Sequence, residues 1–223
     1  MFWRSPSAPA LRSIDVALPL FFAQAIHATM NQTTNPSPPA LGPIVLTVMI
    51  LLAALSRVLP HPPNFSPIEA VALFGGAYFA QRGVALLVPL VAMMLSDMML
   101  GWLNGGIYLD YFADAHFLSI YACIALSTVL GFGLRGRVSG ARVVGYSLVG
   151  SVLFFLLTNA AVWMTATNLA ENPACYSGLG ACYAAGLPFF QWTVAGTLFY
   201  SAILFGGFAL LRQRVPQLQA QTA

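Results

Sequence analysis

The sequence predicts an all-α membrane protein with six transmembrane helices and with both termini in the cytoplasm. Of its 223 residues, 59% are hydrophobic and 7% are charged, whereas about 25% of the residues of a soluble domain are charged. The apolar residues come in blocks of about 15 to 25, the length that crosses ~30 Å of hydrocarbon as a helix. Nearly all the arginines fall on one side of the predicted spans, as in the cytoplasmic joints of membrane proteins.

Residues 1–40 are predicted to form an N-terminal extension and a linker. Residues 14–28 look like a signal peptide, because a short apolar stretch follows Arg4 and Arg12. Two alternatives stay open, namely an interfacial helix and a translation start at Met30. The polar, proline-rich stretch after that methionine is a linker on each interpretation.

Six apolar segments follow and define a membrane domain over residues 41–211, with a cytoplasmic tail at residues 212–223. The second segment is the shortest, and its Gly75-Gly76 pair predicts that another backbone approaches closely. All six must be helices, because lipid offers no partner for an unpaired backbone group. The predicted spans are residues 41–59, 67–81, 84–103, 117–134, 143–164 and 187–211.

The distribution of arginine sets the predicted orientation, because cytoplasmic joints of membrane proteins accumulate Arg and Lys. Eight of the nine arginines fall in the N-terminal segment, in the joints after spans two and four, or after span six. The opposite side holds Arg57, Glu69, Asp110, Asp114 and Glu171. Both termini are therefore predicted to be cytoplasmic in a bacterial inner membrane, which argues against a cleaved signal peptide.

The stretch from residue 57 to residue 116 combines most of the polar chemistry with two apolar segments. Asp97 is the first functional candidate in it. An ionisable group at such a depth costs roughly 2.5–3.5 kcal/mol on insertion scales, so it needs a partner or a water-filled cavity. Asp97 would anchor a ligand under an outer vestibule. The alternative is a carboxylate that only pairs helices near the outer interface.

A proline-rich corner of sequence PHPPNFSP precedes the second span. Its prolines fix φ and withhold backbone donors, which predicts a rigid turn. Such a turn would present His61, Asn64 and Phe65 to a ligand from the outer side, although a purely structural hinge explains the pattern as well. Ser66 is predicted to cap the next helix, with Glu69 in its first turn.

Polar and aromatic side chains also gather near the outer ends of spans five and six. Asn159 and Gln191 are amides among aromatic residues on one membrane face, where they would orient a polar ring or an amide. Trp102 and Trp163 join the candidates, although an interfacial aromatic belt is the default for such residues. The predicted substrate-binding residues are His61, Asn64, Phe65, Asp97, Trp102, Asn159, Trp163 and Gln191.

The three cysteines predict neither a zinc nor an iron–sulfur site, because the sequence has no Cys-x-x-Cys pair and no Cys/His cluster. Cys175 and Cys182 share an outer loop and could form a disulfide there, with chance co-occurrence as the alternative. Cys123 is predicted to be a small core residue. No cofactor, no nucleic-acid partner and no enzymatic activity is predicted. The sequence lacks His-Glu-x-x-His, the phosphate-binding Gly-x-x-x-x-Gly-Lys and Gly-x-Ser-x-Gly.

Long motifs carry a resemblance over residues 41–211. They are PHPPNFSPIEAVALFGGAYF, LLVPLVAMMLSDMMLG, FFLLTNAAVW, GLGACYAAGLPFF and FYSAILFG. Through them the chain resembles an uncharacterised bacterial family of candidate transport proteins. That family is similar to the six-helix S components of energy-coupling-factor (ECF) vitamin transporters. The resemblance implies an S-component-like bundle, an outer first loop that closes over the substrate, and a coupling subunit with ATPases as partners.

Two departures from that pattern keep the coupling partner open. Gly196-Thr197-Leu198 stands where the resemblance leads us to expect Gly-Asp-Leu, and the first span has no Ala-x-x-x-Ala pattern for docking a coupling subunit. The sequence therefore predicts a membrane protein that binds a small, vitamin-like solute from the outer side. It would be the S component of an ATP-driven importer or a solitary transporter. The rivals are a non-transporting assembly or structural subunit and an intramembrane enzyme.

Overall fold

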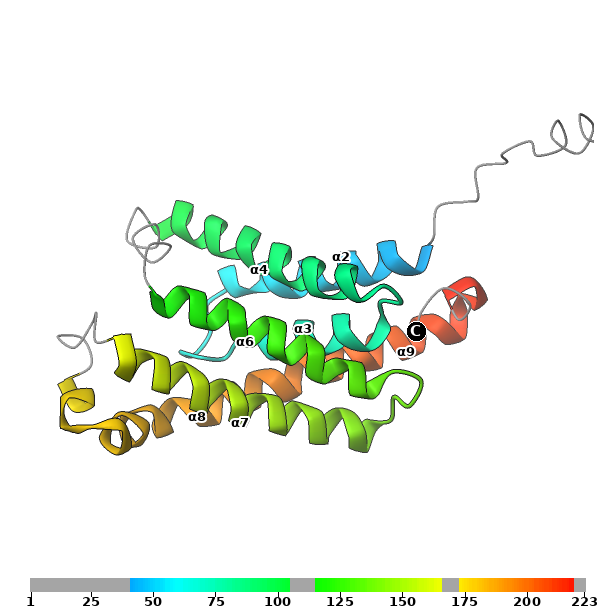
Figure 1. Cartoon of the computed structure of the whole chain (residues 1–223). Coiled ribbons are helices and arrows are strands. Elements are labelled where there is room, and N and C mark those ends of the chain that lie inside the picture. Colours follow the sequence, from blue (N-terminus) through cyan, green and yellow to red (C-terminus); the bar gives the residue numbers. More distant parts are fainter. Residues whose placement is uncertain (1–40, 105–114, 166–172, 219–223) are drawn as a thin grey trace, which may run out of the picture. The chain divides into compact units, whose positions relative to one another are not determined.

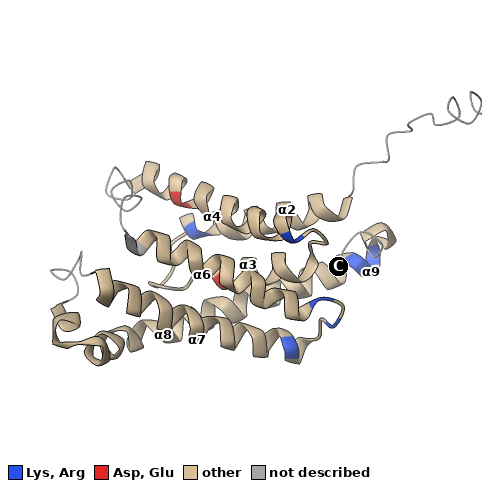
Figure 2. Cartoon of the chain, in the orientation of Figure 1, with Lys and Arg blue, Asp and Glu red and all other residues tan. Residues whose placement is uncertain are grey.

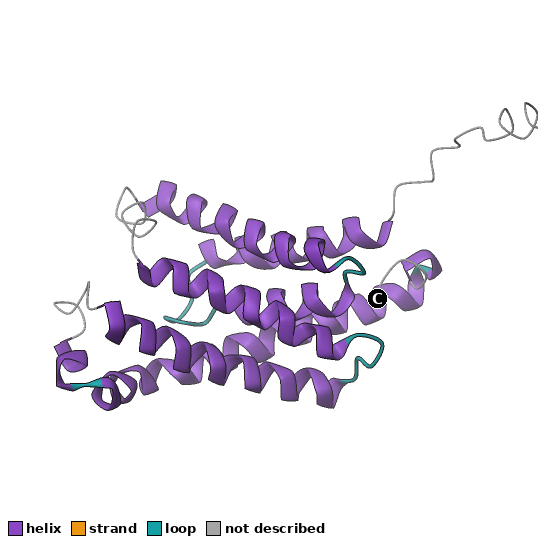
Figure 3. Cartoon of the chain, viewed as in Figure 1, coloured by secondary structure: helices purple, strands orange, loops and turns teal. Residues whose placement is uncertain are grey.

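The computed structural model describes residues 41–104, 115–165 and 173–218, without the side chains of Ala115 and His116. These residues are almost entirely helical and include no β-strand (Figure 1, Figure 3), which confirms the all-α prediction for them. The helices are α2 (Leu41–Leu55), α3 (Ile68–Tyr78), α4 (Arg82–Asn104), α6 (Ala115–Gly131), α7 (Gly140–Thr165), α8 (Leu179–Ser201) and α9 (Gly207–Arg214). The 3₁₀ segments are η1 (Ser56–Val58), η2 (Phe132–Leu134), η3 (Pro173–Ser177) and η5 (Pro216–Leu218), and a π-helical turn, η4 (Ala202–Gly206), joins α8 to α9.

Five helical stretches are long and apolar enough to cross a membrane, so the chain is a multi-pass membrane protein. They are Leu41–Val58, Arg82–Asn104, Phe117–Leu134, Gly140–Thr165 and Leu179–Arg214. The predicted second span differs, because its helix α3 has 11 residues. At ~1.5 Å per residue it is roughly 16 Å long, about half the thickness of the hydrocarbon layer. A sixth complete span therefore stays a prediction.

The surfaces of the long helices are those of a protein that meets lipid. Large apolar side chains project from them, and Leu52, Leu118 and Leu210 are 65%, 68% and 65% exposed. Contiguous apolar surface of this kind is rare on soluble monomers. A bilayer would cover it.

The last long helix begins earlier than predicted. Helix α8 starts at Leu179 rather than at residue 187, and Pro188 lies inside it. The glycines and the proline of GLGACYAAGLPFF favour a loop, but membrane helices tolerate such residues when neighbouring helices satisfy the backbone. The predicted tail is also partly packed, since Leu218 of η5 is buried and η5 contacts α2.

Helix α3 lies at the centre of the bundle (Figure 1). All of its residues are buried, and it contacts α2, α4, α6, α7 and α8. Glycines bring it against α6 backbone to backbone. A Cβ on Gly76 would collide with the Thr128 carbonyl oxygen, and one on Gly131 would lie 2.5 Å from the Leu73 carbonyl oxygen. The close approach predicted for this glycine-bearing helix is therefore present.

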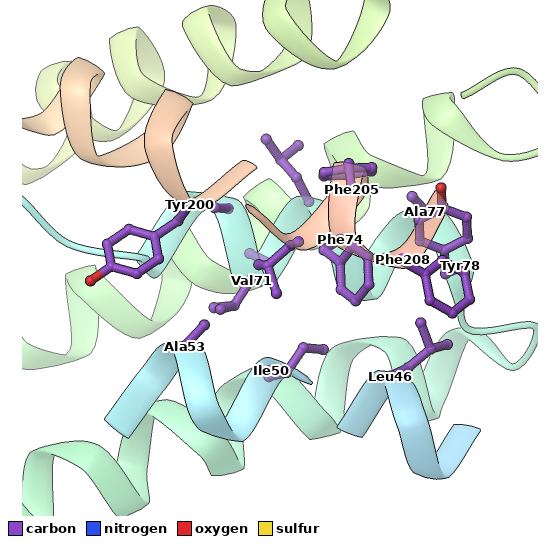
Figure 4. Close-up of a cluster of buried hydrophobic side chains, with 14 of the residues drawn as sticks. Leu46, Ile50, Ala53, Val71, Phe74, Ala77, Tyr78, Tyr200, Phe205 and Phe208 are labelled. Carbon is purple, nitrogen blue, oxygen red and sulfur yellow. The ribbon is translucent and has the colours of Figure 1, made fainter. Parts of the chain in front are cut away.

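An aromatic cluster surrounds the C-terminal half of α3 (Figure 4). It consists of Phe74, Tyr78, Phe205 and Phe208, with ring centroids between 4.6 Å (Tyr78 and Phe208) and 5.7 Å (Phe74 and Phe208, and Tyr78 and Phe205) apart. Most of these pairs are edge-to-face, an arrangement that the ring quadrupoles favour. The cluster therefore ties α3 firmly to η4 and α9.

Most described arginines lie at one end of the bundle, which we call the arginine end. In Figure 2 the basic segments at the start of α4, in the α6–α7 connection and on α9 lie together there. Arg135 binds the last carbonyl groups of α3, because its Nε donates to Gly76 at 2.9 Å and its Nη2 donates to Phe79 at 2.7 Å. A cation at a helix C-terminus is favourable for the helix dipole as well.

Candidate functional site

A cavity of about 560 Å³ lies at the end of the bundle opposite the arginine end. We call it the end cavity. Its walls come from the α2–α3 connection, the start of α3, the outer turns of α4, α6, α7 and α8, and η3. Three phenylalanines, Phe154, Phe155 and Phe189, supply much of its apolar lining. Its polar lining consists of Arg57, His61, Asn64, Ser66, Glu69, Thr158, Asn159 and Thr193.

The proline-rich corner forms one wall of the end cavity. Its turn is closed by the Phe65 N–H, which donates to the Pro62 carbonyl at 3.1 Å. Asn64 has a φ of 65°, in the left-handed region that Asn occupies more readily than most residues. The His61 ring nitrogens lie 2.9 Å and 3.2 Å from the carbonyl oxygens of Pro62 and Arg57. Local hydrogen bonds therefore add to the rigidity that the prolines predict.

Helix α8 supports the corner from behind. A Cβ on Gly196 would lie 2.7 Å from the backbone nitrogen of Ser66, and the Phe65 ring packs 5.5 Å from that of Phe199. The predicted helix cap at Ser66 is wrong, because Pro67 occupies the N-cap position and no side chain caps the helix. The Ser66 hydroxyl lies one residue too early to reach the first free N–H groups. It has no hydrogen-bond partner among the described residues.

Asp97 is bound by other side chains and does not line the end cavity. Its Oδ1 lies 2.5 Å from Nη1 of Arg57, and the Tyr121 hydroxyl donates to its Oδ2 at 2.7 Å. The neighbouring Ser96 donates to the Ala54 carbonyl at 2.8 Å. These contacts join η1, α2, α4 and α6. Because both carboxylate oxygens have partners, the geometry favours the helix-pairing alternative, and the ion pair fixes Arg57 in the cavity wall.

Glu69 differs from Asp97, because it lines the end cavity and one of its carboxylate oxygens has no described partner. Its side chain lines the end cavity and is 2% exposed, yet its Oε1 has no hydrogen-bond partner among the described residues. A Cβ on Gly150 of α7 would lie 3.7 Å from the Glu69 Cγ, so α7 packs against the Glu69 side chain at this glycine. Burial of a carboxylate without partners is costly. Glu69 therefore has unused binding capacity.

Helices α7 and α8 form the wall that faces the corner. The Asn159 Nδ2 donates to the Phe155 carbonyl at 2.8 Å. A Cβ on Gly186 would lie 2.6 Å from the Asn159 Oδ1. The glycine therefore allows α8 to pack closely against the Asn159 side chain. The Phe155 ring packs 4.8 Å from that of Phe190. One amide and a pair of rings thus shape this wall.

A disulfide joins Cys175 and Cys182 and borders the end cavity. It connects η3 to the first turn of α8, and it is the pairing that the sequence left open. Cys123 is a free, buried cysteine in α6, in line with the core position expected for it.

The structure brings only some of the predicted substrate-binding residues together. His61, Asn64 and Asn159 line the end cavity, whereas Phe65 packs against α8 and Asp97 pairs with Arg57. The remaining three lie on the surface. Trp102 and Trp163 are 80% and 42% exposed, and Gln191 is exposed while its Nε2 donates to the Pro188 carbonyl at 3.0 Å.

Glu69 and Arg57 are the functional candidates that the sequence predictions miss. The sequence predictions place Glu69 in the first turn of a helix, where it complements the helix dipole, and they count Arg57 only as a charge on the outer side. A signal for Glu69 was present, because an ionisable residue that opens an apolar segment is a site candidate by default. Thr193 and Phe154 carry no such signal, since single residues of these types are common in membrane helices.

Several predictions concern residues outside the described ranges. These are the N-terminal extension, the acidic joint with Asp110 and Asp114, and Glu171. Across the part of the chain that the structure describes, no group of three or more His, Cys, Asp or Glu residues is arranged to hold a metal ion.

The chain matches a protein-family model over most of its length. The model described as "Family of unknown function (DUF6580)" matches residues 39–218. No curated protein and no solved structure matches the chain.

Proposed function

The chain belongs to this family of unknown function over residues 39–218, so we propose its function from the end cavity: the protein binds a small solute there and serves membrane transport. It is the solute-binding subunit of an ATP-driven importer or a solitary transporter. A non-transporting assembly or structural subunit and an intramembrane enzyme are the rival functions.

The end cavity is the observation that carries this proposal. Its volume of about 560 Å³ falls within the ≈ 300–1,000 Å³ typical of small-molecule sites. Aromatic rings and a few converging polar groups line it, which is also typical of such sites.

The charge distribution supports a cavity that faces outward. The arginine end carries the described arginines other than Arg57 (Figure 2), and cytoplasmic joints accumulate arginine. The disulfide borders the cavity at the other end, and disulfides persist in oxidising compartments. We therefore propose that the cavity opens to the outside of a bacterial inner membrane and that both termini are cytoplasmic.

ATP-driven uptake would need partner subunits, because the sequence has no phosphate-binding motif. The similarity to ECF S components supports a coupling subunit with ATPases. The missing acid in Gly196-Thr197-Leu198 favours a solitary transporter instead, and Gly196 already serves to pack α8 against the proline-rich corner. Affinity purification from native membranes distinguishes the two, since co-purifying ATPases are expected only for the importer.

Native mass spectrometry of the purified protein tests solute binding. We expect wild type to retain a small molecule. Ala185→Trp, which places a large ring in the cavity lining, should lose it, whereas Ala184→Trp, at an exposed neighbour outside the lining, should keep it. Chemical turnover of the solute by the protein would favour the enzyme. Wild type without any bound solute would contradict the proposal and favour the assembly subunit.

A further inference from the structure

The end cavity has an unbalanced set of charges. Among the described residues, Glu69 is the only acid that lines it. Arg57 also lines it, but its guanidinium is paired with Asp97. His61 is exposed, and both of its ring nitrogens lie against backbone carbonyl oxygens. No cation of the described chain is therefore paired with Glu69.

One carboxylate oxygen of Glu69 also lacks a hydrogen-bond donor. Its side chain is 2% exposed, and its Oε1 has no partner among the described residues. The Ser66 hydroxyl, about one turn earlier in the same cavity wall, is buried without a described partner as well. An ionised carboxylate in such surroundings is strongly disfavoured unless an opposite charge pairs with it. A cation from outside the described chain would supply that opposite charge.

Besides the Glu69 carboxylate, the end cavity contains aromatic rings, which also attract cations. Phe154, Phe155 and Phe189 line the same cavity as Glu69. The face of an aromatic ring attracts a cation through its quadrupole, and the rings also bury the apolar part of a ligand. A buried carboxylate beside several rings, without a competing cation, is the chemistry that recognises an organic ammonium ion.

We propose that the solute is a small organic cation, with one ammonium-type charge on an apolar body, and that Glu69 is its charge partner. This inference rests on the proposed function, because it names the class of solute that the end cavity binds. The ammonium group would donate to the Glu69 carboxylate and to the Ser66 hydroxyl, while the phenylalanines would enclose the apolar body.

Three probes with the same aryl body test the charge class. They are 2-phenylethylammonium, neutral 2-phenylethanol and anionic 3-phenylpropanoate, each titrated at pH 7 into the full-length protein in detergent and measured by calorimetry. Wild type is expected to bind the cation about ten- to a hundredfold more tightly than the neutral probe, the gain from a charge-assisted hydrogen bond. The anion should bind most weakly. Equal affinities for the cation and the neutral probe would overturn the proposal.

Glu69→Gln keeps the shape of the side chain and removes its charge. The variant is expected to bind the cationic and neutral probes within about threefold of each other, because the charge-assisted bond is lost. Glu69→Asp keeps the charge on a shorter stem and should restore part of the preference. A Glu69→Gln protein that still prefers the cation would overturn the proposal. So would a ligand-free variant that melts well below wild type, since Glu69 would then be a structural residue.

The cavity-filling variant separates this proposal from the proposed function. Suppose the neutral or anionic probe binds best and Ala185→Trp, but not Ala184→Trp, blocks it. The cavity then binds solutes, and only the cation assignment is wrong. If no probe binds and native mass spectrometry finds no solute in wild type, both proposals are wrong.

Discussion

At the scale of single residues, the ion pair between Arg57 and Asp97 is the first contact to test. The two side chains are 14% and 11% exposed, so removal of one leaves a nearly buried charge without its partner. Asp97→Asn is therefore expected to lower the free energy of unfolding by about 3 kcal/mol, the low end for breaking a buried pair. Thermal or denaturant unfolding of the detergent-solubilised variant measures this.

The matched control removes both charges. Arg57→Gln combined with Asp97→Asn leaves no unpaired ion, so it should recover part of the stability lost in the single variant. If Asp97→Asn leaves stability unchanged and weakens solute binding instead, Asp97 is a ligand anchor as the sequence predicts, and the helix-pairing interpretation is wrong.

Asn64 allows its side chain and its backbone to be tested separately. With a φ of 65°, Asn64→Gly removes the amide without strain and should leave the free energy of unfolding within about 1 kcal/mol of wild type. Asn64→Val should cost about 1–2 kcal/mol, because a Cβ-branched residue is disfavoured in the left-handed region. Unfolding curves of the two variants give the comparison. Weaker binding of the co-purified solute by Asn64→Gly would place the amide in the site, and unchanged affinity would exclude it.

Some residues of the candidate site could be predicted from their type and from their position in a span. Others could not, because their role depends on which side chains pair with them in the fold. His61, Asn64 and Asn159 could be named because a proline-rich corner and an amide within an apolar span can be recognised in the sequence. Asp97 and Glu69 carry the same functional group. Only the fold shows that Arg57 and Tyr121 bind the first, and that Oε1 of the second has no described partner. Trp102 was wrongly included among the site candidates by its residue type, since tryptophan is also common on surfaces at the membrane interface.

At the scale of elements, the contact between α3 and α6 depends on glycine. Gly76→Ala is expected to lower the free energy of unfolding by about 1–3 kcal/mol, because the new Cβ would overlap the Thr128 carbonyl oxygen. Gly145→Ala is the matched control. This glycine lies in α7 with nothing near its Cβ position, so alanine there should be neutral or add up to about 1 kcal/mol through helix propensity. Equal effects of the two substitutions on melting temperature would contradict the close approach.

Hydrophobic length predicted most helices but not the role of α3. Stretches such as 84–103 and 143–164 match α4 and α7 because lipid requires a helix wherever about 20 apolar residues run together. Residues 67–81 satisfy the same criterion in part, yet α3 is enclosed by other helices rather than by lipid. Composition does not distinguish these two apolar surroundings. Similarly, Pro188 reads as a boundary in the sequence and lies inside α8 in the fold.

At the scale of the whole molecule, the proposed orientation predicts opposite locations for the two ends of the bundle. A reporter fused to the C-terminus should be cytoplasmic, because Arg212 and Arg214 precede it. A tag inserted beside Gly178, in the connection from η3 to α8, should be accessible from outside. Reporter activity and labelling of intact cells measure the two positions. Both tags on one side would rule out the proposed topology.

The shortness of α3 has an electrical consequence. The end cavity reaches Glu69 in the first turn of this helix, and the whole of α3 is only roughly 16 Å long. Aqueous solution in an open cavity conducts ions, so most of the membrane potential would fall across this thin partition instead of across the full bilayer. Each elementary charge that crosses 100 mV changes its energy by about 2.3 kcal/mol. A cation would therefore reach Glu69 almost independently of voltage, and its next step, past Phe74 and Tyr78, would be the one that a negative cell interior drives.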